Sequence, residues 1–242
     1  MSVNAFVNVA KKAACRKKSC FTVNKPLAAA VKRIAVLAAV FLCLAAPVRA
    51  EDAAKPVAGK TVLAFGDSLT AGYGLDRDDA LPARLQRLLE QKGYEGVRII
   101  NAGVSGDTTA GGVSRLAWTL KRQNPDYVIL ALGGNDMLRA IDPAATEKNL
   151  RNMLETLKAA KIPVLLAGMR APASMGPAFA GAYARMYAAL AKEYDAVYYP
   201  FILDGVAMDP AYNQRDGVHP NAEGVKIIAA RMLPYLEQLL QK

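Results

Sequence analysis

Short runs of apolar residues alternate with longer amphipathic stretches from about residue 58 to the end of the chain. The runs are four to six residues long and rich in Val, Ile, Leu and Tyr. Runs of this kind are typical of strands that are buried on both faces. They predict five strands, at residues 61–65, 97–100, 127–132, 163–167 and 196–199.

The stretches between and after these runs have the periodicity of helices. In residues 144–160, for example, apolar side chains recur at i, i+3, i+4 and i+7, which is one face of a helix. Strands that alternate with helices indicate βαβ units and therefore a parallel sheet covered on both sides. We expect an α/β protein, a three-layer α/β/α sandwich around a central five-stranded parallel sheet. The predicted helices are residues 80–92, 110–122, 144–160, 178–194 and 222–240.

The first 50 residues have a different composition from the rest of the chain. Lys32 and Arg33 precede an uninterrupted apolar run, residues 34–46, and small residues then lead to Ala50. A charged region, a short apolar region and small-residue spacing are the pattern of a secretory signal peptide. The run of 13 residues is shorter than the roughly 20 that a membrane span needs. We therefore expect residues 1–50 to be a signal peptide that is cleaved after Ala50, with an uncleaved N-terminal anchor as the alternative.

The signal peptide prediction gives residues 51–242 as one domain that is periplasmic or secreted, with no stable membrane span after cleavage. Charge supports this division. The formal net charge is +10, but nine of the 31 basic residues and none of the 21 acidic residues fall in residues 1–50. The remaining 22 bases and 21 acids nearly balance, and no basic stripe remains for a nucleic acid to bind. We expect the protein to have no nucleic-acid partner. We also expect it to be a monomer.

Cysteine chemistry is excluded for the predicted domain, and its composition argues against a zinc site. All three cysteines lie within residues 1–50, which leaves the domain without a disulfide, a thiolate metal ligand or a thiol nucleophile. The domain has one histidine, and a zinc site is therefore improbable. Nothing in the sequence implies a cofactor.

Polar and glycine-rich segments follow the predicted strands. In an open α/β sheet, ligands bind at the carboxyl ends of the strands. Loops that are distant in the sequence would therefore converge on one edge of the sheet. The four segments are Gly66-Asp67-Ser68-Leu69-Thr70, Asn101-Ala102-Gly103-Val104-Ser105-Gly106-Asp107, Gly133-Gly134-Asn135-Asp136 and Asp216-Gly217-Val218-His219-Pro220-Asn221.

These four segments, in this order and with Asp three residues before His, resemble those of the GDSL or SGNH hydrolase family. The chain is similar above all to the bacterial periplasmic thioesterase I/lysophospholipase/arylesterase branch, and the resemblance covers residues 58–240. It implies the flavodoxin-like fold of SGNH hydrolases for residues 51–242. The nucleophile elbow G-x-S-x-G is absent, because Thr70 stands where its second glycine would be. This argues against the α/β-hydrolase fold.

The resemblance implies a catalytic triad of Ser68, His219 and Asp216. Ser68 would be the nucleophile, and His219, the only imidazole in the chain, would accept the proton of Ser68. Asp216 would hold His219 in the correct tautomer. Each residue also has a structural alternative: Ser68 as a helix N-cap, Asp216 as a turn former, and His219 as a side chain satisfied by local hydrogen bonds.

The resemblance also implies an oxyanion hole formed by the backbone N–H groups of Ser68 and Gly106 and by the side-chain amide of Asn135. At position 106 a glycine would let the backbone approach the substrate closely, although it could equally be a plain turn glycine. We interpret Asp67 and Asp136 as structural, orienting the loops by hydrogen bonds to backbone N–H groups.

Apolar residues in the same loops could line a groove for an acyl chain, or simply pack under the loops. The substrate would be a small-molecule or lipid ester. We expect a serine esterase that hydrolyses aryl and short-to-medium acyl esters, lysophospholipids or acyl thioesters through an acyl-enzyme. The alternatives are an O-acetyl esterase or acyltransferase acting on cell-wall or extracellular polysaccharide, and an inactive binding module on the same scaffold. The candidate substrate-binding residues are Leu69, Tyr73, Met137, Leu138, Ile141, Met169 and Pro172.

Overall fold

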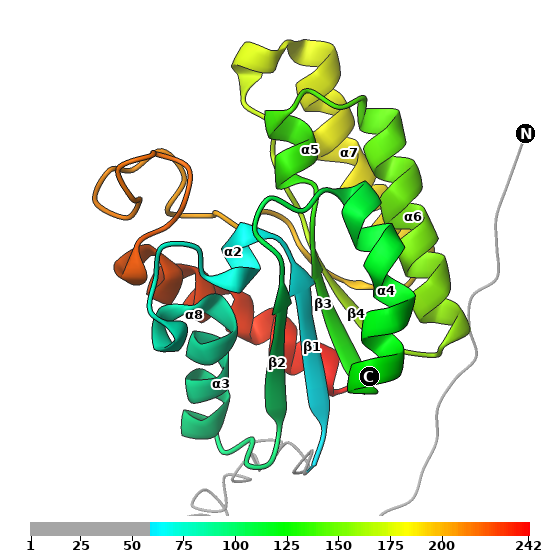
Figure 1. The fold of residues 1–242 in the computed structure, drawn as a ribbon, viewed down its shortest axis with the longest axis vertical. Helices are drawn as coiled ribbons and strands as arrows, with labels where there is room; N and C mark the ends of the chain where they lie inside the picture. Colours follow the sequence, from blue (N-terminus) through cyan, green and yellow to red (C-terminus); the bar gives the residue numbers. More distant parts are fainter. Residues whose placement is uncertain (1–58) are drawn as a thin grey trace, which may run out of the picture. The chain divides into compact units, whose positions relative to one another are not determined.

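A computed structural model describes residues 59–242, and the predicted signal peptide lies outside these residues. Five strands form one sheet in the order β2-β1-β3-β4-β5, and every neighbouring pair is parallel. This order is that of flavodoxin-like sheets. The predicted five-stranded parallel sheet is confirmed (Figure 1). The strands are β1 (Thr61–Gly66), β2 (Arg98–Gly103), β3 (Tyr127–Ala131), β4 (Val164–Ala167) and β5 (Val197–Tyr199).

Five long helices cover the sheet in two layers, which confirms the α/β/α sandwich (Figure 1). Two of them pack together on one face, and the other three pack in a row on the opposite face. Each begins and ends within one residue of its predicted bounds, because the amphipathic periodicity stops where the helix stops. The first layer is α3 (Leu81–Gln91) and α8 (Ala222–Leu240), and the second is α4 (Thr109–Gln123), α6 (Pro143–Ala159) and α7 (Pro177–Glu193).

Burial of all the strands on both faces was expected, and for β2 this expectation is wrong. All residues of β3 and β4 are buried, whereas every residue of β2 is exposed or half-buried. The physical reason includes position, because β2 lies at the edge of the sheet and pairs with β1 alone. The other edge strand, β5, keeps two of its three residues buried and contacts both α7 and α8. Strand β2 also runs past its predicted end to Gly103, where the Asn101 Oδ1 accepts a hydrogen bond from the Gly103 N–H (2.9 Å).

Four short helical elements were not predicted as separate elements, since three to five residues carry no periodicity. All of them lie in loops that follow strands. Within residues 59–242 no helix is both long and apolar enough to cross a membrane. The short elements are α2 (Ser68–Ala71), the 3₁₀ helix η1 (Arg77–Asp79), α5 (Gly134–Leu138) and the 3₁₀ helix η2 (Ala173–Met175).

The turn after β3 is fixed by two fully buried tyrosines of α7. The Tyr187 hydroxyl donates to the Leu132 carbonyl (2.8 Å), and the Tyr183 hydroxyl donates to the Gly133 carbonyl (3.3 Å). Gly133 has φ +115°, and a Cβ there would lie 2.1 Å from the Tyr187 hydroxyl. A side chain is therefore excluded at this position by both the backbone conformation and the space. The turn leads directly into α5, which carries Asn135.

Candidate active site

Three polar side chains from two distant loops form a chain of hydrogen bonds. The His219 Nε2 lies 2.9 Å from the Ser68 Oγ, and the His219 Nδ1 lies 2.7 Å from the Asp216 Oδ2. Ser68 comes directly after β1 and Asp67, whereas Asp216 and His219 belong to the segment between β5 and α8. The structure thus brings together the three residues of the predicted triad.

The hydrogen bonds of Asp216 indicate which nitrogen of a neutral His219 ring carries the proton. Hydrogen bonds from the His219 N–H, from the His219 side chain and from the Val218 N–H lower the pKa of Asp216 to about 2. Asp216 is therefore a carboxylate near neutral pH and can only accept hydrogen bonds. The proton of a neutral His219 ring lies on Nδ1, which donates to Asp216, and Nε2 accepts from the Ser68 hydroxyl.

Ser68 is the first residue of α2 and does not cap it. The N-cap is Asp67, whose Oδ1 accepts from the Leu69 N–H (3.0 Å), and α2 ends at Gly72 in the left-handed conformation. The capping alternative for Ser68 is therefore not what the structure shows. The Ser68 hydroxyl is directed to His219 instead, and Ser68 is 8% exposed.

Asn135 lies at the start of α5, where its Nδ2 donates to the Asp107 carbonyl (2.9 Å) and faces the Asp67 Oδ2 (3.4 Å). Its amide is thus held between the loops that follow β1 and β2. Gly106 belongs to the second of these loops and has φ +81°. Within the protein a Cβ at Gly106 would meet only the end of Arg139, and the positive φ by itself favours a glycine at this position.

A cluster around Arg115 of α4 was not found from the sequence. The Arg115 guanidinium donates to the Gly66 carbonyl, the Ala102 carbonyl and the Asp107 carboxylate, at 2.7–2.9 Å. It also stacks 3.8 Å from the centroid of the Phe65 ring. One side chain therefore joins the carboxyl ends of β1 and β2 to the loop that precedes α4. An arginine in the middle of an amphipathic helix gives no sequence signal for such a role.

An apolar cavity of about 400 Å³ opens beside the Ser68 and His219 side chains. Five of the seven candidate substrate-binding residues line it: Leu69, Met137, Leu138, Met169 and Pro172.

Tyr73 and Ile141 are not among the residues that line this cavity. The Tyr73 ring instead packs against the His219 ring, with 4.6 Å between centroids. The Ile141 N–H donates to the Asp136 carbonyl (2.9 Å), just after the end of α5.

The segment between β5 and α8 supplies a wall of the cavity that the sequence analysis missed. Only its Asp216 and His219 were singled out, although the segment follows a parallel strand and hence had to lie at the ligand-binding edge. That rule was the available signal. The additional lining residues of this segment include Phe201, Leu203, Ala207, Met208 and Val218.

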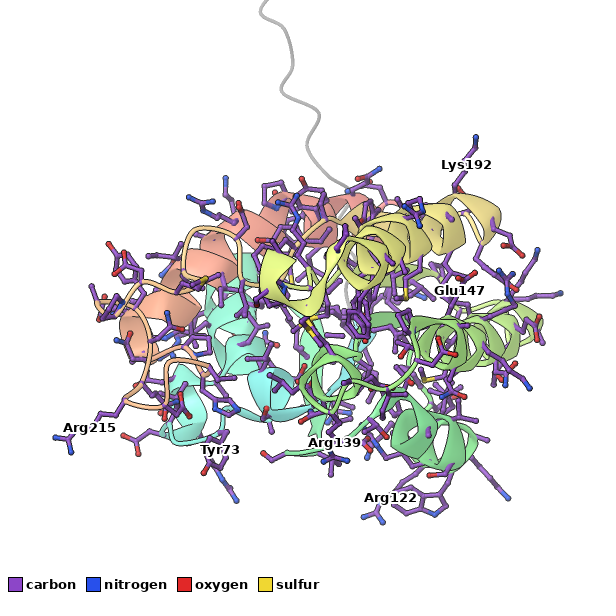
Figure 2. The ribbon with its side chains drawn as sticks, turned by 90° about the horizontal axis from the view of Figure 1, so that it is seen from above. Tyr73, Arg122, Arg139, Glu147, Lys192 and Arg215 are labelled. Atoms are coloured by element: carbon purple, nitrogen blue, oxygen red, sulfur yellow. The ribbon has the colours of Figure 1, made fainter. Side chains whose placement is uncertain are left out.

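Exposed apolar side chains gather around this cavity. Of the six large apolar side chains that are exposed among residues 59–242, Leu138, Met208 and Val218 line the cavity and Tyr73 contacts His219. Tyr73 is labelled in Figure 2, which views the molecule from the side where the loops after the strands gather. Contiguous exposed apolar groups of this kind mark a binding surface.

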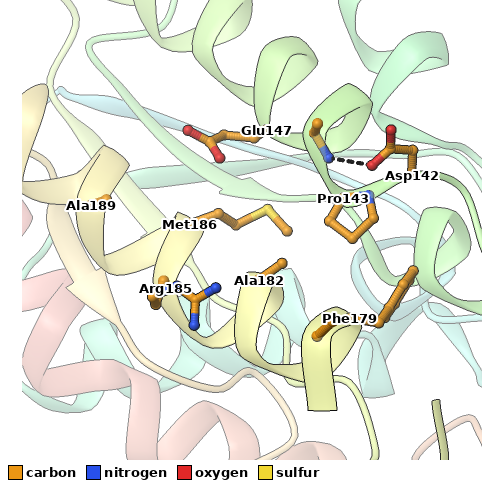
Figure 3. Close-up of a pocket in the computed structure, with 10 residues that line it drawn as sticks. Asp142, Pro143, Glu147, Phe179, Ala182, Arg185, Met186 and Ala189 are labelled. Atoms are coloured by element: carbon orange, nitrogen blue, oxygen red, sulfur yellow. Dashed lines mark hydrogen bonds between the residues drawn. The ribbon is translucent and has the colours of Figure 1, made fainter. Parts of the chain in front are cut away.

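A second hollow, of about 560 Å³, lies between α6 and α7 (Figure 3). Ala182, Met186 and Phe179 of α7 face Pro143 and Glu147 of α6 across it, and none of the triad residues lines it. For the described part of the chain, no group of three His, Cys, Asp or Glu side chains could hold a metal ion. The cavity beside Ser68 is therefore the candidate site.

This arrangement defines a class of protein: a flavodoxin-like α/β domain with a serine, a histidine and an aspartate at the carboxyl edge of its sheet. Comparison with known proteins identifies the family. Residues 64–227 match the GDSL-like lipase/acylhydrolase family, and the chain belongs to it.

Among similar proteins is thioesterase 1/protease 1/lysophospholipase L1 of Escherichia coli, with 39% identity over 186 residues, or 77% of this chain and 88% of that protein. The crystal structure of TesA matches with a TM-score of 0.71 and 38% identity, over 74% of this chain and 99% of the other. That of AlinE4, an SGNH-hydrolase family esterase, matches with a TM-score of 0.63 and 45% identity, over 74% and 96%. The chain is therefore a carboxylic ester hydrolase of the SGNH type.

Asp67 is a titratable group whose burial affects stability. Burial is the largest influence on it and raises the pKa to about 6, from an ordinary value near 3.8. Between these two pH values the folded chain keeps a proton that the unfolded chain has lost. The free energy of unfolding therefore falls as pH rises through this window, by up to about 3 kcal/mol.

We expect Asp67→Asn to remove this fall, because the amide does not ionise. Urea unfolding at pH 4, 5, 6 and 7 would measure it, and the loss of stability between pH 4 and 7 should be up to about 3 kcal/mol larger for the native chain. Asp126→Asn is the matched control, since the pKa of Asp126 is lowered rather than raised. Parallel pH profiles for the native chain and Asp67→Asn would contradict the expectation.

Proposed function

We propose that the chain is a serine esterase that works through an acyl-enzyme formed on Ser68. One observation carries the proposal: the hydrogen-bond chain Ser68 Oγ, His219 Nε2, His219 Nδ1, Asp216 Oδ2, with links of 2.9 and 2.7 Å, at the wall of an apolar cavity. A serine hydroxyl is a weak nucleophile at neutral pH and needs an adjacent base. His219 is the only imidazole in the chain.

In the first half-reaction the Ser68 Oγ attacks the ester carbonyl carbon, and the proton of Ser68 passes to the His219 Nε2. The tetrahedral intermediate then collapses, the bond to the leaving group breaks, and the leaving alcohol or thiol takes that proton. In the second half-reaction His219 removes a proton from water, which attacks the acyl carbon. The carboxylic acid leaves, and Ser68 regains its proton. Asp216 stays ionised throughout and stabilises the imidazolium.

The oxyanion of each intermediate requires donors that are already in place. The Ser68 N–H belongs to the first turn of α2 and has no acceptor within that helix. The Asn135 Nδ2 is held at the junction of the loops after β1 and β2. We assign these two groups and the Gly106 N–H to the oxyanion hole.

The substrate we propose is an ester with an apolar acyl or aryl group. The cavity of about 400 Å³ is lined mainly by apolar side chains, and apolar residues continue to its mouth. This favours aryl esters and short-to-medium acyl chains, and it is compatible with a lysophospholipid or an acyl thioester. The names thioesterase and lysophospholipase of the Escherichia coli relative support the same range. No observation favours a polysaccharide substrate.

Ser68→Ala should fold normally and lose at least about a thousandfold in kcat, because no other group of the site can form the acyl-enzyme. Hydrolysis of p-nitrophenyl esters of increasing chain length measures the loss. Ser114→Ala is the control, since the Ser114 hydroxyl is exposed and donates to the Gly111 carbonyl of α4. A fluorophosphonate probe should label Ser68 alone. Full activity in Ser68→Ala would refute the proposal, and no activity in the native chain would favour a binding module.

Asn135→Ala should lower kcat by about 10²–10³, or roughly 2.7–4 kcal/mol, with a smaller effect on KM. The reason is that the oxyanion forms only after the substrate has bound. Steady-state kinetics on one p-nitrophenyl ester separate the two parameters. A rise in KM alone would mean that Asn135 binds the ground state and that its assignment to the oxyanion hole is wrong.

We also infer that the protein is exported, on the sequence of residues 1–50, which lie outside the described residues. Cleavage after Ala50 would give a periplasmic or secreted enzyme that begins at Glu51. Mass spectrometry of the full-length chain after expression in a bacterium tests this: the mature protein should begin at Glu51 and leave the cytoplasm. A chain that retains residues 34–46 and sediments with the membrane would instead show an uncleaved anchor.

A further inference from the structure

The donors of the proposed oxyanion hole are two backbone N–H groups and a side-chain amide, and their positions depend on contacts with other residues. Residues 104–108 contain Gly106, whose φ of +81° makes this segment a turn, and Asp107, whose carbonyl accepts the Asn135 amide. Val104, Ser105 and Gly106 of this segment are exposed. The Val104 N–H donates to the Gly66 carbonyl (3.0 Å), and the exposed Arg139 Nη2 donates to the Gly106 carbonyl (2.9 Å). A further support holds Asp107.

Arg115 supplies that support. Its Nε donates to the Asp107 Oδ2 (2.7 Å), its Nη1 to the Ala102 carbonyl (2.9 Å) and its Nη2 to the Gly66 carbonyl (2.9 Å). Gly66 is the last residue of β1, only two residues before Ser68. One planar group thus links the strand that leads to Ser68, the strand that leads to Gly106, and the residue whose carbonyl holds Asn135.

The geometry of these contacts also explains why the residue is an arginine. The three acceptors lie around a fork of N–H donors whose angles are fixed, and one face of the guanidinium rests 3.8 Å from the Phe65 ring centroid. A lysine has one ammonium group and cannot reproduce this fork. The side chains of Arg115 and Asp107 are 20% and 11% exposed, so water competes little for the bonds.

We propose that Arg115 is a positioning residue for ester hydrolysis: it fixes residues 104–108 against the end of β1 and so sets the distance from Ser68 to the Gly106 N–H and the Asn135 amide. This inference rests on the proposed function. The three side-chain hydrogen bonds of Arg115 end on Gly66, Ala102 and Asp107, and none of these residues lines the cavity. Arg115 should therefore influence how well the oxyanion is stabilised, and the oxyanion forms only during the reaction.

The test uses the coupling between Arg115 and Asn135. Arg115→Met should lower kcat about a hundredfold, as expected for a displacement near 1 Å in the site, and change KM less than threefold. In an Asn135→Ala background the same substitution should lower kcat by a clearly smaller factor than in the native chain, because one of the two donors that Arg115 positions is already gone. Arg122→Met is the matched control. Arg122, which is labelled in Figure 2, is on the same helix, but its guanidinium lies over the Trp118 ring. It should leave both parameters unchanged.

Equal losses of kcat in the native and Asn135→Ala backgrounds would overturn the proposal, and so would a rise in KM alone. If Arg115→Met does not fold, as judged by circular dichroism and thermal unfolding, Arg115→Lys and Asp107→Asn are put through the same cycle under the same criterion. Ser68→Ala serves as the blank in every assay. A blank that retains activity refutes the acyl-enzyme itself, whereas an inactive blank with additive losses refutes only the role of Arg115.

Discussion

The position of Asp67 is the constraint on which the site depends. Its carboxylate is 1% exposed and is held between the first turn of α2, where it accepts the Leu69 N–H, and the amide of Asn135. The same carboxylate therefore fixes the helix that begins with Ser68 and faces the proposed oxyanion donor. Burying it raises the pKa to about 6, so near neutral pH its ionised form destabilises the fold. This unfavourable burial occurs where the loops that follow β1 and β3 meet.

The remaining supports of the site come from helices on the same side of the sheet. Arg115 of α4 holds the ends of β1 and β2, and Tyr183 and Tyr187 of α7 hold the turn after β3. Asp136 adds a buried link, since its carboxylate accepts from the Thr109 N–H (2.8 Å) and the Thr109 hydroxyl at the start of α4. The opposite layer, α3 and α8, makes none of these bonds. Rigid elements that hydrogen-bond the residues of a site keep its donors in position before the substrate arrives.

The sequence predicted the elements well because their signals are local. The amphipathic periodicity of residues 144–160 stops where α6 stops, and β3 and β4 are uniform apolar runs because they lie in the middle of the sheet. The exposure of β2 was not predictable in this way, because an edge position follows from strand order and not from composition. Asp216 and His219 were predictable because three residues of one turn suffice to bring them together. The bond of Arg115 to Gly66 and that of Asp67 to Asn135 were not predicted, since these partners lie 49 and 68 residues away.

The loops around Ser68 and the part of the cavity wall between β5 and α8 therefore differ in how well they tolerate substitution. The groups around Ser68 are each held by at least one partner from another element, so a substitution at Gly66, Asp107 or Gly133 disturbs more than one loop. The wall formed by Leu203, Ala207 and Met208 is less constrained by its surroundings. Met208 is 87% exposed, and the segment follows the short edge strand β5. Such a wall can vary in size at little cost to the fold, because exposed loops tolerate change that packed elements do not. The positions of Ser68 and Asn135 thus depend on the sheet edge and on α4 and α7, whereas Leu203, Ala207 and Met208 form a part of the cavity wall that can change more freely.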